Sequence, residues 1–92
     1  MANVIVTVKI MPSSPEIDLK KLEEEAKKLI ASFAGRGETK IEIEPIAFGL
    51  KALKITFVMD EKKGSPDPVA EKINELEGVN SAEIVDVRRA IG

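Results

Sequence analysis

Apolar residues follow two different periods in the first half of the chain, one typical of a strand and one typical of a helix. Over Asn3–Met11 they alternate with mixed residues, which predicts a β-strand with one face against a core. The predicted core face carries Val4, Val6, Val8 and Ile10, and the partly exposed face carries Ile5, Thr7, Lys9 and Met11. Over Asp18–Phe33 apolar residues recur at helical spacing, with Asp18 placed to cap the first turn and Gly35 and Gly37 to end the helix.

The second half of the chain predicts three more strands and one more helix. A charged alternating run, Glu38–Glu44, and a more apolar run, Leu50–Met59, predict two strands joined by a turn. Ser65 is expected to cap a second helix, whose first turn tolerates proline, and Gly78 is expected to follow it as the C′ residue. A last strand is predicted over Ala82–Arg88.

The same periods predict which side chains of these elements face the core. The residues concerned are Ile41, Ile43, Leu53, Ile55, Phe57, Val69, Ala70, Ile73, Leu76, Val85 and Val87. In the last strand Ile84 lies beside Val85, so the register of that strand stays open, because a shift by one residue exchanges the two faces.

The order of elements is β-α-β-β-α-β, which predicts an α+β fold of the ferredoxin-like type. Two right-handed β-α-β units give a four-stranded antiparallel sheet with both helices on one face, in the spatial order fourth, first, third and second strand. In this arrangement the turn around Phe48 and the residues Arg88 and Arg89 lie at opposite ends of the sheet. The length of 92 residues suits a single domain with one core.

Composition excludes several kinds of site. The chain has three Phe, no Trp, Tyr, Cys or His, so disulfides and thiolate or imidazole metal ligands are absent, as is the commonest general base. A net charge of −2 gives no general attraction to nucleic acid or anionic lipid. The apolar runs are too short to span a membrane and no cationic leader precedes them, so we expect a cytoplasmic protein without membrane or direct nucleic-acid contacts.

Clusters that invite a catalytic or metal-binding interpretation have simpler explanations. The acidic run Glu23–Glu25 is followed by Lys27 and Lys28 at helical i,i+4 spacing, which favours a solvated helix face. Glu42 and Glu44 share a strand face, as an acid/base pair would, but an exposed charged strand also protects a sheet edge. We favour the edge strand.

The chain also lacks the residues with which other ferredoxin-like domains bind RNA or metal ions or carry out catalysis. The open sheet face has none of the aromatic residues on which RNA-recognition modules stack bases. Pro12–Pro15 stands where metal carriers have a cysteine pair and acylphosphatases an arginine. No phosphate loop or catalytic triad is present, so we expect no cofactor and no enzymatic chemistry.

The stretch Pro45–Lys51 joins the two middle strands and places Phe48 at the tip of their turn. A large apolar side chain at this position either folds back over the core or binds a partner. Sequence physics alone favours the core, because exposed aromatic residues are uncommon.

The same stretch, Pro45–Lys51, resembles the turn of the translation elongation factor 1-beta family, Pro-Ile/Val-Gly-Phe/Tyr-Gly-Ile-Lys. The opening Val8–Pro12 and the ending Asp86–Arg89 are also similar to archaeal members, so the resemblance is collinear over the chain. It implies a guanine nucleotide exchange factor that acts on the GTPase elongation factor 1-alpha by protein contact. The partner-binding residues that it implies are Pro45, Ile46, Phe48, Gly49, Lys51, Arg88 and Arg89.

The sequence departs from the family pattern at two places. Ala47 replaces a glycine, which stiffens the turn slightly. Eukaryotic members end with a lysine associated with the magnesium site of the GTPase, whereas this chain has Arg88 and Arg89 near its end. Adjacent strand residues point to opposite faces, so these arginines cannot act as one cluster. A regulatory module that binds a small metabolite remains the alternative function.

Overall fold

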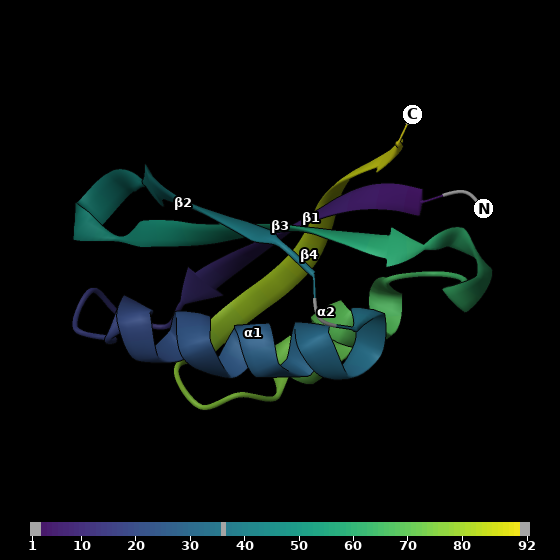
Figure 1. Ribbon diagram of the computed structural model, residues 1–92. Helices are drawn as coiled ribbons and strands as arrows, with labels where there is room; N and C mark the ends of the chain where they lie inside the picture. The colour runs from purple at the N-terminus through teal and green to yellow at the C-terminus, as the bar shows by residue number, and fades with distance from the viewer. Residues whose placement is uncertain (1–2, 36, 91–92) are drawn as a thin grey trace.

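The computed structural model describes residues 3–35 and 37–90, which contain the predicted order of strands and helices (Figure 1). The elements are β1 (Asn3–Pro12), α1 (Leu19–Ala34), β2 (Thr39–Pro45), β3 (Lys51–Asp60), α2 (Asp67–Asn74) and β4 (Val79–Arg89). Two short 3₁₀ turns, η1 (Ala47–Gly49) and η2 (Glu61–Lys63), flank β3. Within the described ranges, no helix is long and apolar enough to cross a membrane.

The strands form one antiparallel sheet in the order β2-β3-β1-β4, as predicted. Both helices lie against the same face of this sheet, and the other face is open (Figure 1). The arrangement confirms the α+β, ferredoxin-like prediction. It also confirms that β2 is an edge strand, since β2 stands at one end of the strand order.

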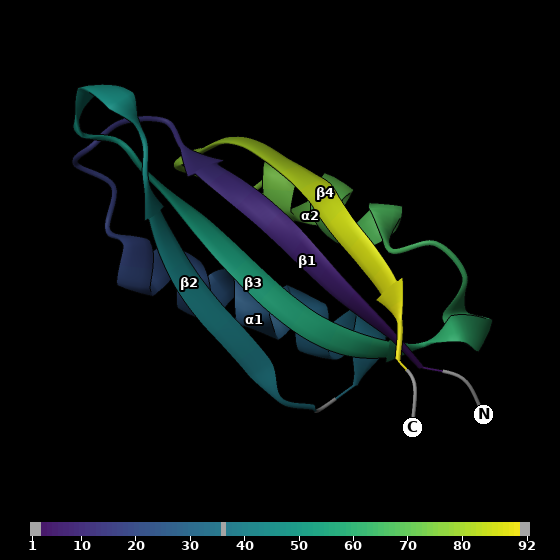
Figure 2. The same ribbon diagram turned by 90° about the horizontal axis from the view of Figure 1, so that it is seen from above.

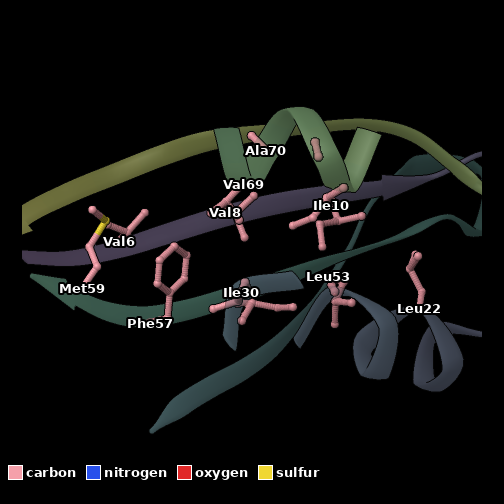
Figure 3. Packing of buried hydrophobic residues seen from close by; sticks show 14 residues of the cluster. Val6, Val8, Ile10, Leu22, Ile30, Leu53, Phe57, Met59, Val69 and Ala70 are labelled. Carbon is pink, nitrogen blue, oxygen red and sulfur yellow. The ribbon is translucent and has the colours of Figure 1, made fainter. Parts of the chain in front are cut away.

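The core lies between the sheet and the two helices (Figure 3). Its fully or nearly fully buried residues include the predicted faces of β1 and β3 and the apolar stripes of both helices: Val6, Val8, Ile10, Leu53, Ile55, Phe57, Leu22, Ala26, Ile30, Val69, Ala70 and Ile73. Burial of each large aliphatic or aromatic side chain contributes about 1.5–3 kcal/mol to folding. The buried side chains named here are aliphatic except for Phe57.

The ends of α1 follow the sequence prediction. The Asp18 carboxylate accepts hydrogen bonds from the backbone N–H groups of Lys20 (3.0 Å) and Lys21 (3.3 Å), which satisfies two free donors of the first turn. Gly35 follows the last turn with φ of +86°, and its N–H donates to the carbonyl of Ala31.

The ends of α2 were predicted only in part. Pro66, not Ser65, is the N-cap residue, although the Ser65 hydroxyl still accepts a hydrogen bond from Asp67 N–H (3.1 Å). The helix ends at Asn74, whose side-chain amide both donates to the carbonyl and accepts from the N–H of Ala82, each at 2.9 Å. Because of this early end, Gly78 lies in the turn before β4 and is not the C′ residue.

The prediction that Val85 faces the core was also wrong. Ala82 is buried and Ile84 packs against the core, whereas Val85 is 44% exposed. A β-bulge is the cause: Thr7 pairs with Asp86 but Val8 pairs with Ile84, so Val85 has no partner on β1 and the alternation is broken.

The outer side chains of β2 and β4 are less buried than predicted. Val87 pairs with Val6, and Ile43 pairs with Leu53, so each lies on the helix-covered face of the sheet. Both are nevertheless half exposed, because they belong to edge strands that the helices cover incompletely. Ile41 packs against the core.

Candidate partner-binding surfaces

The connection between β2 and β3 forms one end of the molecule, far from the described ends of the chain (Figure 2). The β2–β3 ladder reaches as far as the pair Pro45 and Lys51. Beyond it, Ile46 N–H donates to the carbonyl of Leu50 (2.7 Å), and Leu50 N–H donates to the carbonyl of Ala47 (3.3 Å). These two hydrogen bonds close a tight turn with Phe48 at its tip.

Phe48 is 95% exposed, so the prediction that its ring covers the core was wrong. The physical reason is the reach of the hairpin: the last pair between β1 and β3 is Ile10 and Leu53, and the turn, which precedes β3, lies beyond the end of that pairing. At that distance the ring has no core to cover. Exposure of this aromatic side chain favours the alternative interpretation, in which it contacts a partner, because aromatic residues are enriched at protein–protein interfaces.

The backbone of Phe48 is strained as well. Its φ of +63° and ψ of +31° lie in the left-handed region, which costs an ordinary L-residue about 1–2 kcal/mol. Gly49 follows with φ of +76°, a conformation that glycine adopts without this cost. Strained backbone together with an exposed aromatic ring is typical of a residue retained for function.

Five of the seven predicted site residues gather around this turn. Pro45 and Lys51 are exposed, and Ile46 is half-buried. Beside the turn, Gly49 and Lys51 border an open hollow of about 420 Å³, whose other side is formed by the segment between β1 and α1. The geometry therefore offers an apolar projection next to a concave surface that carries both lysine and aspartate side chains.

Sequence reasoning missed the ion pairs at the base of the turn. The Glu44 carboxylate lies 3.3 Å from the Lys9 ammonium and 3.6 Å from that of Lys54. The hydrogen bond from Lys9, together with the charges of Lys54 and Lys9, lowers the pKa of Glu44 below its ordinary value. The two lysines are direct cross-strand partners, so only the register of β1 against β3 could have revealed the group.

Arg88 and Arg89 lie at the opposite end of the sheet, as predicted (Figure 2). Arg88 pairs with Ile5 on the open face, and Arg89 pairs with Val4 on the helix-covered face, which confirms that they point to opposite sides. Each also has an acidic partner: Arg88 binds Asp86 at 2.9 Å, and Arg89 binds Glu61 of η2. The structure thus separates the predicted site residues into two groups.

The acidic run of α1 is consistent with a solvated helix face, since Glu23 and Lys27 form an i,i+4 ion pair of 3.5 Å. In residues 3–35 and 37–90, no group of three or more His, Cys, Asp and Glu side chains is arranged to hold a metal ion. The candidate site is therefore described by shape and charge.

Comparison with known proteins identifies the family. Residues 5–90 match the family described as the EF-1 guanine nucleotide exchange domain. The chain is 47% identical over 88 residues to elongation factor 1-beta of Pyrococcus abyssi, covering 95% of this chain and 94% of the relative. It is 40% identical over 89 residues to elongation factor 1-beta of Methanothermobacter thermautotrophicus, covering 97% and 98%. With such a match over nearly its whole length, and with the fold and exposed turn that the resemblance implies, the chain belongs to the EF-1 guanine nucleotide exchange domain family.

Proposed function

We propose that this protein promotes the exchange of GDP for GTP on elongation factor 1-alpha by direct protein contact, without chemistry of its own. The observation that carries the proposal, beside the family, is Phe48: an aromatic ring 95% exposed on a strained backbone. In the free protein the exposed ring contributes nothing to stability. In a complex, a partner pocket that receives the ring removes its apolar surface from water, which favours binding.

Exchange follows from linkage between two ligands of the GTPase. A factor that binds the nucleotide-free form more tightly than the GDP form must weaken GDP binding by the same coupling free energy. Such a factor needs a surface complementary to one state of the GTPase. It needs no nucleophile, general base or cofactor.

In this proposal the Phe48 turn is the anchor. Aromatic residues that enter a desolvated pocket dominate interfaces, and their truncation typically costs ~2 kcal/mol or more of binding. Pro45, Ile46 and Gly49 hold the turn, and Lys51 lies beside it. The two hydrogen bonds of the turn fix its shape before binding, so little conformational freedom is lost in the complex.

Arg88 and Arg89 provide a second contact at the far end of the sheet. Guanidinium groups remain charged and bind carboxylates or phosphates in bidentate geometry. Their side chains are 75% and 68% exposed despite their acidic partners. We assign the whole chain to one exchange domain that works in the cytoplasm, without direct contact to nucleic acid or membrane.

The test is release of a fluorescent GDP analogue from elongation factor 1-alpha of the same organism. The wild-type chain should accelerate release, and Phe48→Ala should do so far less at equal concentration. Val85→Ala is the matched control, because this side chain is also apolar and exposed but lies on the bulge of β4. GDP release that is unchanged by the wild-type chain contradicts the proposal.

A further inference from the structure

The end of the hairpin that carries Phe48 extends past the centre of the sheet. Pairing between β1 and β3 ends at Ile10 and Leu53, whereas pairing between β2 and β3 continues through Glu44 with Ala52 and Pro45 with Lys51. Figure 2 shows the turn beyond the tip of β1. The last part of the hairpin is therefore not supported by a third strand through backbone hydrogen bonds to β3.

Hydrophobic packing holds only the base of this part of the hairpin, where Ala52, the partner of Glu44, is buried. Ile43, the last core-side residue of β2, is 50% exposed, and Ile46 is half-buried. The turn itself contributes no buried side chain. Elements with few buried apolar contacts open and move at low free-energy cost, so another interaction must fix the orientation of the turn.

Glu44 supplies that interaction. It lies on β2 directly before Pro45, and its two carboxylate oxygens contact Lys9 on β1 (3.3 Å) and Lys54 on β3 (3.6 Å). One side chain at the base of the turn is thereby joined to two other strands. The contact with Lys9 connects the edge strand directly to β1, across the intervening strand β3.

The two lysines that contact Glu44 carry like charges. Lys9 and Lys54 are directly opposite each other, and like charges in this position destabilise a sheet. A carboxylate shared between them converts repulsion into attraction. Without Glu44, the ammonium groups beside the hairpin would repel each other, and the local arrangement would have to change.

We infer that Glu44 is a positioning residue, which through Lys9 and Lys54 holds the Phe48 turn in the orientation needed for docking on the GTPase. The inference rests on the proposed function. All three side chains are partly exposed, with 26–41% of their area accessible, so they contribute little to global stability. Their effect is local, on the mobility of the turn and hence on binding.

Glu42 provides a matched control on the same strand. It lies on the same open face, one alternation before Glu44, and its cross-strand partner is Lys54. Among the described residues it makes no ion pair. Removing Glu42 changes the net charge as much as removing Glu44 does, but leaves the contact to β1 intact.

The first test measures backbone mobility in the isolated protein by ¹⁵N relaxation. Glu44→Ala should lower the amide order parameters of Ala47, Phe48 and Gly49 from about 0.85 toward about 0.6, the change from rigid to flexible backbone. Glu42→Ala should leave them at the wild-type values. Equal order parameters in Glu44→Ala and wild type overturn the inference.

The second test separates KM from kcat in GDP release, with the GDP-bound GTPase as substrate. Loss of preorganisation weakens binding, so Glu44→Ala should raise KM about three- to tenfold with kcat nearly unchanged. Glu44→Gln keeps the length and one acceptor oxygen and should recover part of the loss. A Glu44→Ala protein with wild-type KM, or with a KM equal to that of Glu42→Ala, contradicts a positioning role.

The two tests also separate this inference from the proposed function. If wild-type protein fails to release GDP, the function is wrong, whereas the relaxation comparison still decides whether Glu44 holds the turn. If wild-type protein releases GDP but Glu44→Ala behaves identically, the function stands and the positioning role is wrong.

Discussion

The two ends of the sheet meet solvent in opposite ways. At one end, Phe48 exposes an apolar ring on a strained backbone. At the other, Arg88 and Arg89 expose charged groups that already have acidic partners in the free molecule. The difference indicates different contributions to binding: burial of the ring supplies affinity, whereas exposed charges mainly affect the association rate and the choice of partner.

The largest expected effect comes from Phe48→Gly. Glycine adopts the left-handed conformation freely, so this change should remove strain and raise the free energy of unfolding by about 1 kcal/mol, less the added entropy of the unfolded chain. It also removes the anchor and should lower exchange at limiting concentration about 30-fold or more. Urea unfolding and GDP release measure the two effects.

A higher free energy of unfolding together with slower exchange would show that Phe48 is retained for binding and not for stability. Strong destabilisation of Phe48→Gly would assign the ring to the core. Unaffected exchange would show that the ring is not the anchor.

A smaller effect is expected at the other end of the sheet. Arg88→Ala combined with Arg89→Ala should slow exchange about two- to tenfold, because exposed charge pairs are each worth about 0.2–1 kcal/mol. The residual rate should depend less on salt, and the free energy of unfolding should change little. Stopped-flow measurements at several salt concentrations test this. Full activity with unchanged salt dependence would show that Arg88 and Arg89 do not take part in binding the GTPase.

The smallest effect concerns pH. Since the pKa of Glu44 is lowered from 4.5 in the folded protein, its ion pairs are complete above pH 4.5 and are lost as pH falls through the lowered value. Amide mobility of the turn should therefore be constant from neutral pH down to about 4.5 and increase below it. Glu44→Gln should lack this transition. An identical acid-induced change in Glu44→Gln would assign it to other carboxylates.

The sequence predicted the fold well because most elements obey a simple period. The alternation of Val6, Val8 and Ile10 and the helical spacing of α1 report directly on burial. The errors fall where a long-range contact overrides the period. The bulge at Val85 depends on pairing with β1, and α2 ends early where Asn74 binds Ala82.

The candidate site was predicted less completely, for a related reason. The motif located the turn, but whether Phe48 covers the core depends on how far the hairpin extends past β1, which no local pattern encodes. The contacts of Glu44 need the register of three strands. Resemblance to the family supplied the residues to inspect, and the structure supplied their exposure and their partners.

The ring of Phe48 is proposed to carry the interaction with the GTPase. The most direct test is the rate of GDP release from elongation factor 1-alpha against factor concentration, for wild type, Phe48→Ala and the double arginine variant. We expect the arginine variant to approach the wild-type maximal rate at saturation, and Phe48→Ala to give little acceleration over the concentrations at which wild type saturates. Wild-type acceleration by Phe48→Ala at equal concentration would contradict the claim.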